Sequence, residues 1–174
     1  VAKSTGADSK VILAVGKESV LVQRVIDGVI HSARTSDPNF VRQEISAGNE
    51  SAAMDFANAM SPSLFGELTV LVVSGIDSAT DELAEQINLY LDNVPDHIRL
   101  VFTHPGGVKG KRLLETIRKS GVVEANCSEL KSKDLEAALV AEFKKHGRKV
   151  TAAAITQLQT SLGTGLSELL SAVS

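Results

Sequence analysis

The sequence has 174 residues, which suits one ordinary domain or a medium domain with a small one. Hydrophobic residues make up 43% and aromatic residues 3%, so a sizeable core can form but must be aliphatic. The formal net charge of −3 argues against general coating of nucleic acid, although it does not exclude a local basic patch. The single Cys127 and four scattered histidines predict no internal disulfide and no metal site, and fit a reducing cytoplasm. No stretch approaches the length of a membrane span.

Roughly the first 125 residues alternate between two apolar patterns, one typical of strands and one typical of helices. Residues 1–10 lack an apolar run and are expected to form a flexible leader, and Val11 to Val15 is a continuous apolar run typical of a strand buried on both faces. From Glu18 to Arg34 the apolar residues recur at helical spacing. The elements predicted next, in chain order, are strand 40–45, helix 50–60, strand 68–73, helix 81–91, strand 98–102, helix 110–120 and a weak strand 122–125. This alternation predicts an α/β fold with a parallel sheet and right-handed crossovers.

After Cys127 the β-branched runs end and a helical pattern takes over. Ser132 and Thr151 are expected to cap helices, and Gly147 suits the position after a helix end. Three helices are predicted, at 132–146, at 151–163 and from 166 onward. We therefore expect an α/β domain at 11–126 and a small helical domain at 127–174. Because the last helix has no stop signal, the natural chain is expected to continue.

Two segments resemble phosphate-binding loops without completing the motif. Such a loop needs the pattern G-x-x-x-x-G-K-[ST], whose backbone N–H groups cradle phosphates. Gly16 follows the first strand, but Lys17 comes next and no second glycine precedes the helix. In the second segment Gly110 and Lys111 are present, but Pro105 and Arg112 stand where Gly and Ser/Thr are required. The sequence therefore predicts no specific nucleotide binding, no metal or cofactor, and no intrinsic catalytic site.

The second segment is nevertheless basic. Lys109, Lys111 and Arg112 lie where a glycine-rich loop opens a helix. Basic side chains at a helix start can reach phosphate, so a contact with DNA or another anion is an alternative to a plain loop. Asp77, after the strand at 68–73, has no acidic neighbour and is expected to serve a turn or a cap.

The segment Ser61-Pro62-Ser63-Leu64-Phe65-Gly66 lies between a predicted helix and a predicted buried strand. Pro62 and Gly66 bracket it as a loop. Leu64 and Phe65 are adjacent, so one strand face cannot bury both. Either the pair tucks onto the sheet edge or it anchors a partner protein, and burial of each side chain would contribute about 1.5–3 kcal/mol.

Several segments together resemble the delta-subunit family of the bacterial DNA polymerase III clamp loader. The resemblance rests on residues 11–22, on Ser61 to Glu67 with the following strand, and on the helical region from Gly147 to Leu169. Residues 107–113 resemble the version found in high-G+C Gram-positive bacteria. The resemblance implies an AAA+-like, P-loop NTPase-like domain, a lid-like three-helix domain, and a collar domain that is absent from this chain.

The resemblance also implies a function. The chain would be a non-catalytic subunit that binds the sliding clamp and favours its opening during loading onto primed DNA, beside gamma or tau and delta-prime subunits in the cytoplasm. Leu64 and Phe65 would be the anchors, with Ser63 and Pro62 beside them, and Pro62 stands where the family often has an apolar contact. The alternative is a doubly wound α/β domain that binds a nucleotide or small molecule at the carboxyl ends of its strands.

Overall fold

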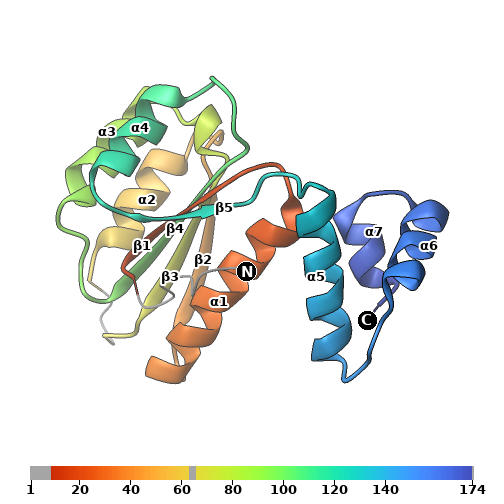
Figure 1. Ribbon diagram of the computed structural model, residues 1–174. Coiled ribbons are helices and arrows are strands. Elements are labelled where there is room, and N and C mark those ends of the chain that lie inside the picture. Colours follow the sequence, from red (N-terminus) through yellow and green to blue (C-terminus); the bar gives the residue numbers. More distant parts are fainter. Residues whose placement is uncertain (1–8, 63–65, 174) are drawn as a thin grey trace. The chain divides into compact units, whose positions relative to one another are not determined.

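The computed structural model describes residues 9–62 and 66–173 of the chain (Figure 1). These residues form two compact units. One unit holds Leu21–Ser128 together with the described residues up to Lys17, and it contains the sheet. The other holds Glu18–Val20 and the described residues from Glu129 onward, and it is helical.

The described residues contain one five-stranded sheet with the order β2-β3-β4-β1-β5, in which all pairs are parallel. The strands are β1 Val11–Val15, β2 Val41–Ser46, β3 Thr69–Ser74, β4 Ile98–His104 and β5 Val123–Asn126. The predicted parallel α/β sheet is thus confirmed. The three central strands are buried along most of their length, whereas β2 and β5 lie at the edges and are more exposed. Edge position explains why their apolar patterns are weaker in the sequence.

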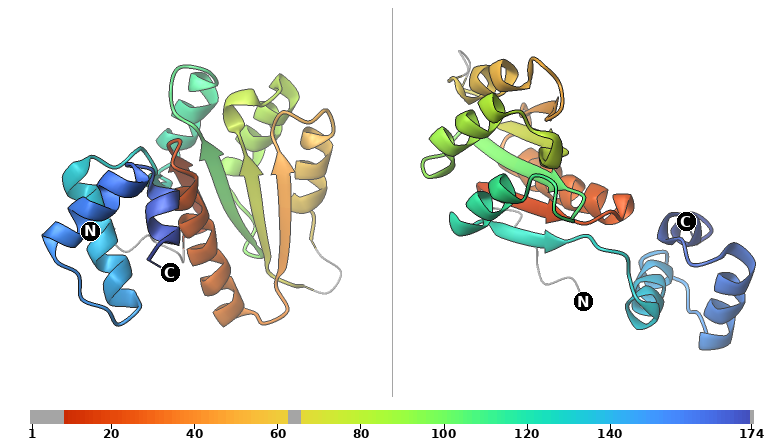
Figure 2. Two further views of the ribbon diagram at one scale, coloured as in Figure 1. Left: turned by 90° about the vertical axis from the view of Figure 1, so that its right-hand side faces the viewer. Right: turned by 90° about the horizontal axis from the view of Figure 1, so that it is seen from above.

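Helices cover both faces of the sheet, and Figure 2 shows α1 on one side and α2, α3 and α4 on the other. Their bounds are α1 Ser19–Ser36, α2 Ala52–Met60, α3 Asp81–Leu91 and α4 Lys111–Lys119. Neighbouring residues of β1 contribute to opposite cores, because side chains alternate along a strand. Ile12 packs with the residues of α1, and Leu13 packs with those of the three other helices.

The helical unit contains α5 Ser132–Lys145, α6 Ala152–Leu162 and α7 Leu166–Ser171. Its buried apolar side chains are Leu135, Leu139, Ile155, Leu166, Leu169, Leu170 and Val173. Arg148 donates a hydrogen bond of 3.3 Å from Nη1 to the carbonyl oxygen of Val173. The predicted small three-helix region is thus confirmed. Among the described residues, no helix is both long and apolar enough to cross a membrane.

Two of the three capping predictions for this unit are confirmed. The N–H of Ala154 donates to Oγ1 of Thr151 at 3.2 Å, which caps α6. Gly147 follows α5 with a φ of 69°, the left-handed conformation that favours glycine. The prediction for Ser132 is wrong, because Lys131 is the extended cap residue and Ser132 is already the first helical residue.

Candidate functional site

A glycine-rich loop at the carboxyl end of β4 is held by a buried histidine. His104 is 1% exposed. The N–H of Gly106 donates to its Nδ1 at 2.9 Å, so Nε2 carries the hydrogen and donates to the carbonyl oxygen of Lys109 at 2.9 Å. Both ring nitrogens therefore bond the loop backbone, and the loop is fixed to the strand that precedes it.

The basic residues of this segment divide into two groups. Lys109 Nζ donates to Oγ of Ser78 at 2.7 Å and lies 3.7 Å from the carboxylate of Asp77, so it is tied to the short 3-10 helix η1 (Ile76–Ser78). Lys111 and Arg112 are exposed at the start of α4. The structure thus brings the three basic residues onto one loop and helix start, with one of them already bonded within the chain.

The start of α4 lies directly against η1. Gly110 has a φ of 65°, and a Cβ added there would lie 2.5 Å from the Cα of Asp77. Asp77 lies within the short 3-10 helix η1, where it pairs with Lys109. Val108, which the sequence analysis did not single out, is 85% exposed in the same loop.

The first loop that resembles a phosphate site is closed by another part of the chain. Gly16 has a φ of 148°, and a Cβ added there would lie 1.9 Å from the carbonyl carbon of Cys127. The N–H of Cys127 donates to the carbonyl oxygen of Val15 at 2.7 Å, and the N–H of Gly16 donates to that of His104 at 2.9 Å. The lack of a side chain at Gly16 therefore allows the backbone of Cys127 to pass directly against it. Burial raises the pKa of the Cys127 thiol to about 11, so this thiol is protonated at neutral pH.

The segment predicted to bind a partner connects α2 to the amino end of β3. Its residues Ser63, Leu64 and Phe65 lie outside the described residues. Ser61, Pro62 and Gly66, which flank them, are exposed. At the entry, Met60 is buried and the N–H of Ser61 donates to the carbonyl oxygen of Asn58 at 3.1 Å. The connection therefore begins at a firmly packed helix end.

The exit of the connection is bonded on two sides. The N–H of Leu68 donates to Oδ2 of Asp37 at 2.9 Å, and the N–H of Val41 donates to the carbonyl oxygen of Leu68 at 2.8 Å. On the other side, the N–H of Thr69 donates to the carbonyl oxygen of His97 at 2.7 Å. Both ends of the segment 61–68 are thus fixed to the α/β unit.

Sequence reasoning missed Asp37. The N–H groups of Leu68 and Asn39 both donate to its carboxylate and hold the pKa of Asp37 below its usual value. An Asp followed by Pro and Asn is a typical turn sequence in which the carboxylate bonds its own backbone. That signal could have identified the contact with Asn39, but not the contact with Leu68, which lies 31 residues away in the sequence.

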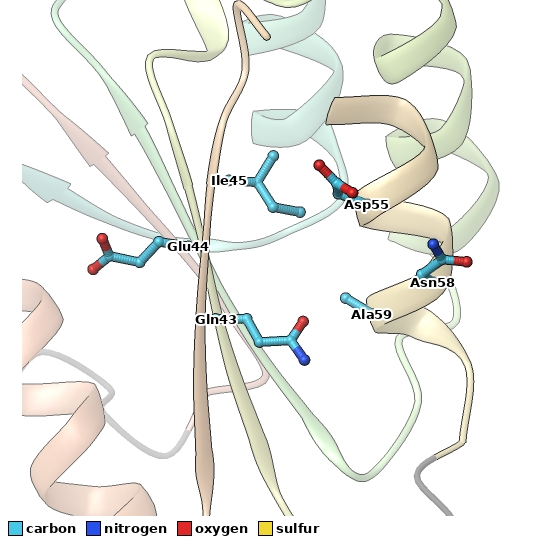
Figure 3. Close-up of a pocket in the computed structure, with 6 residues that line it drawn as sticks. All are labelled: Gln43, Glu44, Ile45, Asp55, Asn58 and Ala59. Carbon is cyan, nitrogen blue, oxygen red and sulfur yellow. The ribbon is translucent and has the colours of Figure 1, made fainter. Parts of the chain in front are cut away.

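A groove that the sequence did not predict lies between edge strand β2 and helix α2 (Figure 3). Its volume is about 390 Å³, and it is lined by Gln43, Glu44, Ile45, Asp55, Asn58 and Ala59. Oγ of Ser51 donates to Oδ2 of Asp55 at 2.7 Å, so this carboxylate already has a partner. The groove runs along the side of the sheet, whereas the alternative of a small-molecule-binding domain expects a site at the carboxyl ends of the strands.

Among the described residues, no group of three His, Cys, Asp or Glu side chains could hold a metal ion.

Comparison with known families gives a match to the DNA polymerase III delta subunit over residues 13–128. The chain belongs to this delta-subunit family. A search of curated proteins with the sequence gave no match.

Solved structures extend the family match to the fold. A Bacillus subtilis DNA clamp loader delta protein superposes with a TM-score of 0.73 at 15% identity, over 97% of this chain and 54% of that one. The Thermotoga maritima RuvB Holliday junction branch migration motor gives 0.55 at 12% identity, over 94% of this chain and 53% of that one. The predicted AAA+-like fold is confirmed by these likenesses. The chain spans about half the length of either structure.

Proposed function

We propose that this chain is the clamp-binding part of a clamp-loader delta subunit, and that Leu64 and Phe65 insert into the DNA sliding clamp with Ser63 and Pro62 beside them. The observation that carries the proposal is the anchored connection between α2 and β3. Hydrogen bonds fix its entry at Ser61 and its exit at Leu68, while its described residues Ser61, Pro62 and Gly66 are exposed. Family membership supplies the class of partner.

Clamp opening would follow from differential affinity. A protein that binds an opened ring better than a closed one shifts the ring toward opening by the difference in binding free energy, and by no more. Burial of one Leu and one Phe would contribute about 1.5–3 kcal/mol each, which is typical of dominant contacts in an interface. No ATP is needed for that step, and neither loop of this chain has a complete phosphate-binding motif.

In the full-length subunit we expect gamma or tau and delta-prime subunits as partners, primed DNA within the complex, and a cytoplasmic place at the replisome. Residues 107–113 favour a high-G+C Gram-positive source. Lys111 and Arg112 are the best placed residues for a DNA phosphate, because Lys109 already bonds η1. Such contacts would make DNA binding by the assembled loader fall with salt.

The test is a titration of the chain against the sliding clamp of the same organism, by surface plasmon resonance. Leu64→Ala with Phe65→Ala should weaken binding by at least about 100-fold, because two buried anchors are truncated. Leu89→Ala is the matched control, since Leu89 is 70% exposed on α3 and lies outside the connection. Equal affinity of the double variant and the wild type, or no binding by the wild type, would contradict the proposal.

A further inference from the structure

The outer edge of β2 presents backbone groups that the sheet does not use. β2 ends the sheet and pairs with β3. The N–H of Val41 donates to the residue before β3 and that of Ala47 to the last residue of β3, each at 2.8 Å. Every second residue of a parallel pair bonds the neighbouring strand, so Arg42 and Glu44 direct both backbone groups outward, and Ser46 its N–H. Among the described residues, these groups have no backbone partner.

The edge of β2 lacks the features that usually protect an edge strand from further pairing. Such strands are commonly blocked by a proline, by a bulge or by unpaired charged side chains. The residues Val41–Ser46 contain no proline and pair with β3 in an uninterrupted register. Arg42 and Glu44 form an ion pair with each other, so their charges offset one another on one face of the strand. The edge is therefore open to a strand of suitable sequence.

The groove between β2 and α2 lies on the other face of β2, beside this edge. Figure 3 shows the side chains of Gln43 and Ile45 pointing toward α2, whereas Glu44 points away. Ile45 and Ala59 are buried, so the groove has an apolar floor. Its volume of about 390 Å³ is within the range of ordinary ligand sites. A strand added to the edge would place every second side chain over this floor.

The charge of the groove favours one kind of side chain. Two of its six lining residues are acidic and none is basic. Glu44 is paired with Arg42, which leaves Asp55 as the charged residue on the α2 side. Oγ of Ser51 donates to Oδ2 of Asp55, and no cation among the described residues pairs with this carboxylate. A lysine or arginine suits both features, because its aliphatic stem packs on apolar surface while its charged end reaches a carboxylate.

We propose that the edge of β2 and this groove bind an extended segment of a partner protein as a sixth strand of the sheet, with a lysine or arginine of that segment beside Asp55. Backbone hydrogen bonds to Arg42 and Glu44 hold the segment, and the groove selects its sequence. This binding site goes beyond the proposed clamp contact and does not depend on Leu64 and Phe65.

The test uses the peptide acetyl-Thr-Val-Thr-Lys-Thr-Val-Thr-amide and its counterpart with Glu in place of Lys, with amide hydrogen exchange followed by NMR. In the free chain the outward amides of Arg42, Glu44 and Ser46 should exchange fast. The lysine peptide near saturation should slow them by at least about 5-fold, whereas the amides of Gln43 and Ile45, which already bond β3, should change little. The glutamate peptide should bind at least about 5-fold more weakly.

Two variants test the edge and the groove separately. Glu44→Pro removes one outward N–H where an edge strand tolerates proline, and it should weaken binding of the lysine peptide by at least about 10-fold. Asp55→Asn should weaken it about 3- to 5-fold and abolish the preference over the glutamate peptide. Asp27→Asn on α1 is the matched control, because Asp27 is also an exposed helical carboxylate that accepts from a side chain four residues earlier. It should change neither affinity.

Three results would overturn the proposal. The first is unchanged exchange of the outward amides at about 5 mM lysine peptide, and the second is equal affinity for the two peptides. The third is slow exchange of these amides in the free chain that speeds up on dilution, because a second copy of the chain would then occupy the edge. If circular dichroism shows Glu44→Pro to be unfolded, the comparison of Asp55→Asn with Asp27→Asn decides. Clamp titration of the Leu64 and Phe65 double variant bears only on the proposed function.

Discussion

The two ends of the parallel sheet are built in opposite ways. At the carboxyl end the loops bond the sheet and one another: both ring nitrogens of His104 bond the loop that follows it, and Cys127 passes against Gly16. At the amino end the connection 61–68 is bonded where it leaves α2 and where it enters β3, and Ser61, Pro62 and Gly66 are exposed.

The difference teaches where to look for function in this fold. In open α/β sheets, ligands usually bind outside the carboxyl ends of the strands, at the point where strand order reverses. Here that point lies between β1 and β4, and the loop glycines there serve packing between segments of the chain. The amino end, which carries no ligand site in the usual case, holds the anchored connection that we propose binds the clamp.

The largest loss of stability is expected where Gly16 packs against Cys127 at the carboxyl end of the sheet. Gly16→Ala places a Cβ against the backbone of Cys127 and forces a φ that side chains rarely adopt, so we expect a loss of about 3–4 kcal/mol of unfolding free energy. Urea denaturation of the wild type and the variant measures this difference in unfolding free energy. The control is Gly28→Ala in α1, where nothing lies within 4 Å, and which should stabilise the protein by about 0.5–1 kcal/mol. A neutral Gly16→Ala would show that the two segments are not in close contact.

A smaller effect is expected from the residue that holds the β4 loop. His104→Ala removes two hydrogen bonds to Gly106 and Lys109 and leaves a cavity, so the unfolding free energy should fall by about 2–3 kcal/mol. The exposed His31 on α1 provides the control, and His31→Ala should stay within about 0.5 kcal/mol of the wild type. Clamp affinity should be unchanged by His104→Ala at temperatures where the variant is folded. A loss of affinity comparable to that of Leu64→Ala would argue that both ends contact the clamp.

The smallest effect concerns the ion pair that joins α4 to β5. Arg118 donates from Nε and Nη2 to the two carboxylate oxygens of Glu124, each at 2.8 Å, and lowers the pKa of Glu124. Arg118→Lys loses this two-point contact, and the Tm should fall by about 3 °C or less because the pair is partly exposed. Since the pKa of Glu124 is lowered on folding, its contribution is present above the ordinary value of 4.5 and is lost as the pH falls through the lowered value. A difference in Tm that persists unchanged into strong acid would rule out this pair as its source.

The sequence predicted the fold closely because the central strands and the amphipathic helices follow simple periodicities. Helix Asp81–Leu91 was predicted to the residue, and the strands to within two residues at each end. Asp37 could not be found in this way, because its bond to Leu68 joins residues brought together only by the pairing of β2 with β3. The same limit applies to Cys127 against Gly16. Ser132 was misplaced by one position because a serine at the first turn and a serine at the cap have the same sequence pattern.

The contrast between the two ends of the sheet can be tested directly by hydrogen exchange of the chain with and without the sliding clamp. The account predicts that the clamp slows exchange in residues 61–68, and that the amides of residues 104–110 and of Gly16 exchange at the same rate in both states. Protection of residues 104–110 without protection of residues 61–68 would contradict the account, because it would place the clamp at the opposite end of the sheet.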